Sequence, residues 1–146
     1  MNSLKVYTDG SCLGNPGRGG WAFIILDRDT VCKEHAGAEL YTTNNRMELI
    51  AVINALETVL SMSSSEVTVV TDSQYVKNGI TAWIYKWKRN NWQTTSKTPV
   101  KNKELWQKLE LYTQQLSVSW EWTKGHNGDK YNERCDFLAR RNSSSL

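Results

Sequence analysis

Apolar and polar positions alternate from Leu4 to Asp9, which is typical of a β-strand. Leu4, Val6 and Thr8 fall on one face of the first run, and the residues between them fall on the other. Residues 21–26 and 31–41 are predicted to form two further strands. Because the connections between these runs are short, we expect the three strands to be antiparallel neighbours.

The spacing of apolar positions becomes helical after residue 42. Leu49, Ile53 and Leu56 recur every three or four residues and follow a Thr-Thr-Asn-Asn helix-start signal, which predicts a helix over about 45–60. The remaining predicted elements are a buried strand at 66–71, a helical stretch after Asp72, a helix at 103–116, a strand at 118–122 and a last helix near 130–141. This order predicts an α/β fold with a five-stranded mixed sheet flanked by helices, in which the first three strands are antiparallel.

The chain has 146 residues, which suits one domain with one continuous core. We expect a single domain over 1–142 and a short flexible tail at 143–146. The sequence lacks a long apolar run and a signal-peptide pattern, so we predict a cytoplasmic protein with no membrane association. Nothing in the sequence suggests more than a monomer.

Charge is unevenly distributed along the chain. No acidic residue lies between Asp72 and Glu104, and that segment carries seven Lys and Arg residues, whereas the whole chain carries a net charge of only +3. Within it, residues 83–106 hold four of the seven tryptophans. A local basic field on a mildly acidic body favours an anionic polymer such as nucleic acid. The cations Lys86, Lys88, Arg89 and Lys101 and the aromatic residues Trp87 and Trp92 are our candidate contacts.

Four carboxylates are candidates for a metal site. Asp9 ends the first predicted strand and Asp72 ends the fourth, while Glu48 and Asp136 lie in predicted helices. If the first and fourth strands are parallel neighbours, Asp9 and Asp72 come together at one sheet edge, where ligands gather in open α/β sheets. The three cysteines form no zinc-binding pattern, so we expect a hard ion held by oxygen, with two Mg²⁺ ions clamping a phosphodiester.

Each carboxylate also has a purely structural interpretation. Asp9 could start a turn before Gly10, and Asp72 could cap a helix. Glu48 stands at capping-box spacing from Asn45, and Asp136 could be a solvated helix residue. Taken one at a time, each carboxylate is explained by its structural interpretation, and the metal-site hypothesis rests on the four together.

Other polar residues could complete a nuclease site. His126 lies in a Gly-flanked loop, where its near-neutral pKa would suit proton transfer to a departing 3′-oxygen. The backbone N–H groups of the helix start at 42–46, with Thr43 and Arg46, could hold a phosphate. Amide side chains can reach minor-groove edges and the 2′-hydroxyl of RNA, and the candidates are Asn15, Asn44, Asn45 and Gln74.

The chain closely resembles bacterial type 1 ribonuclease H. The resemblance covers nearly the whole chain in order, and the combination of motifs is highly specific. The matching stretches are Tyr-Thr-Asp-Gly-Ser-Cys-Leu-Gly-Asn-Pro-Gly at 7–17, Thr-Thr-Asn-Asn-Arg-Met-Glu-Leu at 42–49, Thr-Asp-Ser-Gln-Tyr-Val at 71–76, the basic segment at 83–106, Lys-Gly-His at 124–126 and Asn-Glu-Arg-Cys-Asp at 132–136.

The resemblance implies roles for individual residues. Asp9, Glu48, Asp72 and Asp136 match the metal-binding carboxylates, and His126 matches the loop histidine. Thr43 and Arg46 fall where the family grips a DNA phosphate, and residues 83–103 resemble its basic protrusion. The positions that match minor-groove contacts are Cys12, Asn15, Asn44, Asn45 and Gln74. Arg18 departs from the family because it stands where many relatives have a second proline.

The sequence therefore predicts an endonuclease that cuts the RNA strand of an RNA/DNA hybrid. One Mg²⁺ is expected to activate a water and the other to stabilise the leaving 3′-oxygen, which gives 5′-phosphate and 3′-hydroxyl ends. We also expect Mn²⁺ to be able to replace Mg²⁺. Two alternatives remain at this point: an acid-cluster nuclease or strand-transferase that acts on DNA, and a non-catalytic module that binds hybrids.

Overall fold

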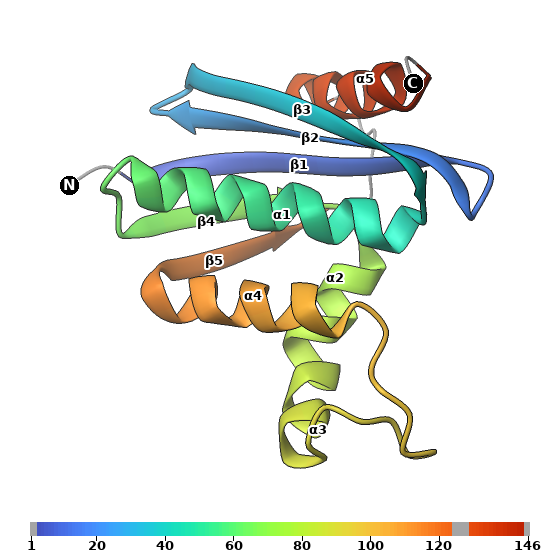
Figure 1. Ribbon diagram of the computed structural model, residues 1–146. Coiled ribbons are helices and arrows are strands. Elements are labelled where there is room, and N and C mark those ends of the chain that lie inside the picture. Colours follow the sequence, from blue (N-terminus) through green and yellow to red (C-terminus); the bar gives the residue numbers. More distant parts are fainter. Residues whose placement is uncertain (1–2, 124–128, 145–146) are drawn as a thin grey trace.

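Five strands form one mixed sheet in the order β3-β2-β1-β4-β5 (Figure 1). The structure is a computed structural model that describes residues 3–123 and 129–144. Strands β1 and β2 pair antiparallel, as do β2 and β3, whereas β4 runs parallel to both β1 and β5. The bounds are β1 Ser3–Leu13, β2 Gly17–Asp27, β3 Thr30–Thr42, β4 Glu66–Thr71 and β5 Ser117–Trp122. The predicted mixed sheet with three antiparallel strands is confirmed.

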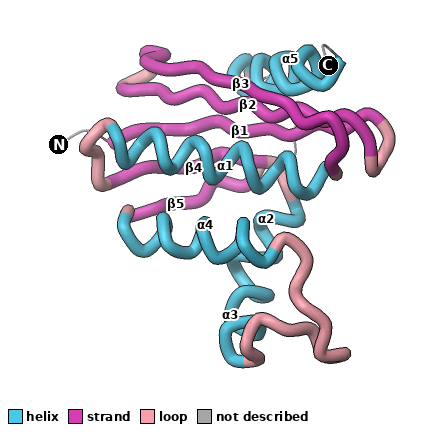
Figure 2. Tube along the Cα trace, viewed as in Figure 1, coloured by secondary structure: helices cyan, strands magenta, loops and turns pink. Residues whose placement is uncertain are grey.

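Helices cover both faces of the sheet (Figure 2). They are α1 Asn44–Ser61, α2 Gln74–Asn78, α3 Ile84–Arg89, α4 Lys103–Gln115 and α5 Lys130–Ser144, and a π-helical turn, η1 Gly79–Trp83, joins α2 to α3. Helices α1 and α4 lie on one side of the sheet, and α5 lies on the other (Figure 1). None of the described helices is long and apolar enough to span a membrane.

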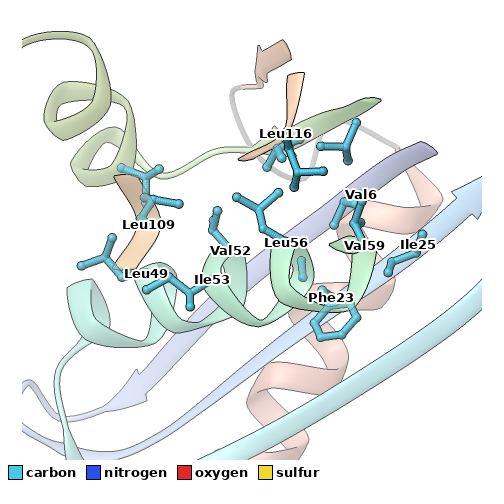
Figure 3. Close-up of a cluster of buried hydrophobic side chains, with 14 of the residues drawn as sticks. Val6, Phe23, Ile25, Leu49, Val52, Ile53, Leu56, Val59, Leu109 and Leu116 are labelled. Carbon is cyan, nitrogen blue, oxygen red and sulfur yellow. The ribbon is translucent and has the colours of Figure 1, made fainter. Parts of the chain in front are cut away.

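Alternate residues of the central strands supply the two cores because side chains point to opposite faces along a strand. Val6, Phe23 and Ile25 are buried with the apolar stripe of α1 and with residues of α4 (Figure 3). Their neighbours Tyr7 and Ile24 are buried on the other face, against Cys135 of α5 and its surroundings. The sheet is therefore buried on both faces, and the carboxyl edge of β1 and β4 is held between α1 and α5.

Helix α3 and the loop that follows it form a protrusion (Figure 1), and an aromatic cluster anchors it. Trp106 of α4 is fully buried and contacts Tyr75 and Trp87, while Trp87 also contacts Trp83 and Trp92. Gly79 makes this packing possible, because a Cβ at that position would collide with the Trp106 ring. The tryptophans of the basic segment therefore form a small core that fixes its position.

Two predicted boundaries differ from the structure. We expected the second strand to begin at residue 21, but β2 already begins at Gly17, and Arg18 pairs with Leu13 of β1. We expected the last helix to end near residue 141, but α5 continues through Ser144. Ser143 is buried, and its hydroxyl donates a hydrogen bond to the Arg140 carbonyl, so the helix has a packed last turn.

Candidate active site

Three of the predicted carboxylates converge at the carboxyl edge of the two central parallel strands. Asp9 lies in β1, Asp72 follows β4, and Glu48 lies in α1. Carboxylate oxygens of these three residues lie within 4.8 Å of one another. The strand register explains the arrangement: Tyr7 pairs with Val70, so two residues further along, Asp9 and Asp72 reach the same level of the sheet.

The local contacts contradict two of the structural interpretations of these acids. The N-cap of α1 is Thr43, whose Oγ1 accepts a hydrogen bond from the Arg46 backbone N–H, so Glu48 does not stand at capping-box position. The N-cap of α2 is Ser73, whose Oγ accepts from the Val76 backbone N–H. The carboxylates of Glu48 and Asp72 are therefore not used to start their helices.

Gly10 allows β1 and α1 to approach closely enough to form the cluster. A Cβ on Gly10 would lie 2.5 Å from the Glu48 backbone nitrogen and 2.6 Å from the Met47 carbonyl carbon, distances that no side chain tolerates. The backbone N–H of Gly10 also interacts favourably with the carboxylates of both Asp9 and Glu48. Only glycine at this position brings the buried strand residue beside the buried helix residue.

Burial and mutual repulsion oppose ionisation of the cluster. Burial, followed by the charges of Asp72 and Asp136, raises the pKa of Asp9 from 3.8 to about 8. Burial, followed by the charges of Asp9 and Asp72, raises the pKa of Glu48 well above its ordinary value. A divalent cation among these oxygens would remove the repulsion, so the donor set fits a hard cation such as Mg²⁺.

Asp136 lines the same cleft from α5. It acts on Asp9 both as a charge and as a side-chain hydrogen-bond partner. Its Oδ1 also accepts a 3.0 Å hydrogen bond from Nε of Arg140, one helical turn later. The cleft has a volume of about 850 Å³ and contains all four predicted carboxylates. The predicted His126 lies outside the described residues.

Several of the predicted substrate-binding residues also line this cleft. Cys12, Asn44, Asn45 and Gln74 surround the carboxylates. Asn15 lies just outside, where its Oδ1 accepts a hydrogen bond from the Asn44 backbone N–H. The Sγ of Cys12 is 3.4 Å from the Thr42 carbonyl oxygen, which links β1 to the residue before the α1 cap.

Backbone N–H groups at the start of α1, which the sequence offered as phosphate donors, are already hydrogen-bonded within the protein. The backbone N–H groups of Asn44 and Arg46 already donate to the side chains of Asn15 and Thr43. The Arg46 guanidinium makes two hydrogen bonds to Glu39, at 2.8 and 3.1 Å. These bonds hold the pKa of Glu39 below its usual value. A phosphate at this site would therefore meet the Arg46 side chain rather than a row of unpaired backbone amides.

The residues predicted in the basic segment lie on the protrusion, away from the carboxylate cleft. Lys86, Arg89 and Lys101 are exposed. Lys88 is also exposed, but its ammonium forms a 2.7 Å ion pair with Glu110 of α4. Trp87 and Trp92 are half-buried members of the aromatic cluster. Lys88, Trp87 and Trp92 therefore stabilise the position of the protrusion.

Sequence reasoning missed five polar residues that line the cleft, namely Ser11, Ser73, Tyr75, Arg140 and Ser144. Arg140 carried a usable signal, because it stands four residues after Asp136 on a predicted helix. Tyr75 carried none, because its hydroxyl accepts from Nε1 of Trp106 at 3.1 Å across 31 residues of sequence.

The sheet order and the carboxylate cluster at the edge of β1 and β4 define a ribonuclease H-like protein. The chain belongs to the RNase H family, whose model matches residues 1–144. It is 56% identical to Ribonuclease H of Ruegeria pomeroyi over 144 residues, which covers 96% of this chain and 92% of that one. It is 52% identical to Ribonuclease H of Treponema pallidum, over 94% of this chain and 88% of that one. The crystal structure of LC9-RNase H1, described as a type 1 RNase H with the type 2 active-site motif, is similar with a TM-score of 0.88 and 30% identity, over 99% of this chain and 74% of that one.

Proposed function

We propose that this protein is an endonuclease that hydrolyses the RNA strand of RNA/DNA hybrids and leaves 5′-phosphate and 3′-hydroxyl ends. The observation that carries the proposal is the convergence of Asp9, Glu48 and Asp72 within 4.8 Å in a member of the RNase H family. Four acids that repel one another have no evident use in a module that only binds nucleic acid, which disfavours that alternative.

The four carboxylates would hold divalent cations. We propose two Mg²⁺ ions, with Mn²⁺ able to substitute, because all the donors are oxygens and the cleft is open to substrate phosphate. When bound, these cations supply an activated water for in-line attack and charge stabilisation for the leaving 3′-oxygen. Asp9 and Glu48 contribute rigid donors, because both are buried and held by Gly10.

Residues around the cleft would distinguish the RNA strand of the hybrid from the DNA strand. Cys12, Asn44, Asn45 and Gln74 can contact the minor groove and the 2′-hydroxyl groups, which mark the RNA strand. Asn15 supports this edge through its bond to the Asn44 backbone. Thr43 and Arg46 would hold a phosphate of the DNA strand, and the exposed cations of the protrusion would extend the contact along the duplex.

His126 would transfer a proton to the departing 3′-oxygen. Its residue type suits general acid catalysis near neutral pH. The segment that carries it joins β5 to α5, and Asp136 lies two turns into that helix. We also propose that the enzyme acts as a monomer in the cytoplasm.

A panel of nucleic acids tests the proposal. The purified protein is incubated with end-labelled RNA/DNA hybrid, duplex RNA, duplex DNA and single-stranded RNA, with Mg²⁺ or with EDTA. We expect Mg²⁺-dependent cleavage of the RNA strand of the hybrid alone. Cleavage of DNA would replace the proposal by a DNA nuclease of the same chemistry, and hybrid binding without cleavage would leave a binding module.

A further inference from the structure

The phosphate-binding arginine of the proposed site is already held by an internal anion. Nε and Nη2 of Arg46 donate to the two carboxylate oxygens of Glu39 at 2.8 and 3.1 Å. A carboxylate in this two-point arrangement presents the same pair of acceptors to a guanidinium as a phosphate group does. Glu39 and an incoming phosphate therefore compete for the same donors.

The position of Glu39 depends on an irregularity in the sheet. Glu39 pairs with Gly19 and Thr42 pairs with Gly17, so β3 has two residues between its partners where β2 has one. This is the pattern of a β-bulge, which changes the direction of side chains on the bulged strand. The bulge lies directly before the Thr43 cap of α1 and brings the end of β3 beside Arg46.

The pair is accessible and exchangeable. The side chains of Arg46 and Glu39 are 40% and 30% exposed, so substrate can reach them without unfolding of the helix start. Ion pairs of this exposure shift an equilibrium by no more than about five-fold. Substrate phosphate can therefore displace Glu39, at a cost that weakens binding to a measurable extent.

We propose that Glu39 acts as an intramolecular phosphate mimic that occupies Arg46 in the free protein and is displaced when the hybrid binds. The inference rests on the proposed function, because it takes the hybrid as the ligand of Arg46. It makes Glu39 a residue that sets substrate affinity and the response of affinity to salt. In the free protein the positive charge of Arg46 is neutralised, so its contact with phosphate contributes less to salt-dependent binding than an unpaired arginine would.

The test compares Glu39→Gln with the wild-type protein by fluorescence anisotropy on a short RNA/DNA hybrid in EDTA, which prevents cleavage. Glutamine keeps the size of the side chain and removes its charge. We expect Kd for the hybrid to fall about two- to five-fold. We expect the plot of log Kd against log salt to become steeper, by at most about 0.9.

Glu34→Gln is the matched control. Glu34 is also on β3 and forms the same two-point pair, with Arg134 of α5 at 2.9 and 3.1 Å, but it lines another surface. Its replacement removes one negative charge from the same strand, so it reports the general effect of charge on hybrid binding. We expect its Kd to be unchanged within error.

A double-variant cycle separates this inference from the proposed function. In an Arg46→Gln background, the effect of Glu39→Gln on Kd should disappear. An unchanged or raised Kd in Glu39→Gln, in a protein that binds the hybrid and loses affinity on Arg46→Gln, overturns the competition and leaves the proposed function standing. If the wild-type protein does not bind the hybrid in EDTA, the inference about Glu39 fails, whereas the proposed function is decided separately by the cleavage panel in Mg²⁺. Thermal unfolding of each variant checks that the fold is retained.

Discussion

Asp9 links the chemistry of the site to the stability of the protein. Its pKa is raised from 3.8 to about 8, mainly by burial and then by Asp72 and Asp136. Between these pH values the folded state holds a proton that the unfolded state has released. Stability without metal must therefore fall as pH rises through this window. The raised pKa of Glu48 acts in the same direction.

We therefore predict that the melting temperature in EDTA decreases from pH 5 to pH 8 and that Mg²⁺ restores it at pH 8. Asp9→Asn should lose most of this pH dependence and be more stable than the wild type at pH 8 in EDTA, on the order of 2 kcal/mol. Thermal unfolding followed by circular dichroism measures both effects. A wild-type stability that is flat or rising over this window would show that the cluster is not strained.

The residue-level picture was partly available from the sequence. Asp9 and Asp72 could be placed together on the condition that the first and fourth predicted strands pair in parallel, and the register shows that they do. The ion pair of Arg46 with Glu39 could not be predicted, because it depends on a bulge between β2 and β3. The pairing of Lys88 with Glu110 was equally hidden, since it joins two helices across the protrusion.

Among the elements, the protrusion depends on close packing between η1 and α4. Gly79 faces the buried Trp106 ring with no room for a methyl group. We predict that Gly79→Ala destabilises the protein by about 1–3 kcal/mol through overpacking. Urea denaturation measures the loss. Ala82→Gly, at an exposed position of the same turn, is the control for backbone effects. Equal stability of Gly79→Ala and wild type would show that the aromatic cluster shifts freely.

The cations of the protrusion should separate into two kinds. Lys86 and Arg89 are exposed, whereas Lys88 is tied to Glu110. We predict that Lys86→Ala with Arg89→Ala raises KM for the hybrid and reduces the salt slope by about 2, with little effect on kcat. Lys88→Ala should instead lower stability by less than about 1 kcal/mol. Steady-state kinetics at several salt concentrations tests this, and an unchanged KM in the double variant would make the protrusion purely structural.

Element boundaries were less predictable than element order. Apolar residues that recur every second position identified the first strand, and apolar residues that recur every three or four positions identified α1. Burial of one face of a strand or helix imposes these spacings. This periodicity did not show that β1 continues past Asp9 to Leu13 or that β2 already begins at Gly17, since glycines carry no side-chain pattern. It also ended α5 too early, because small serines gave no sign that Ser143 is packed.

In the whole molecule, the sheet order brings distant parts of the chain to one cleft. Parallel pairing of β1 with β4 places Asp9 beside Asp72, and the two helical layers add Glu48 and Asp136 from opposite faces. Arg46 of α1 and the exposed cations of the protrusion lie outside this cleft, where they can contact the phosphates of a long anionic ligand. This arrangement suits a duplex that rests on several surfaces while one phosphodiester enters the acid cluster.

The central claim is that this acid cluster cuts the RNA strand of a hybrid. Single-turnover cleavage of a hybrid labelled on each strand in turn, by wild type and by Asp9→Asn in Mg²⁺, tests it most directly. We predict that the wild type cuts only the RNA strand, and that Asp9→Asn binds the hybrid with similar Kd but cleaves at least about 1,000-fold more slowly. Substantial cleavage by Asp9→Asn, or equal cleavage of both strands by the wild type, would contradict the account.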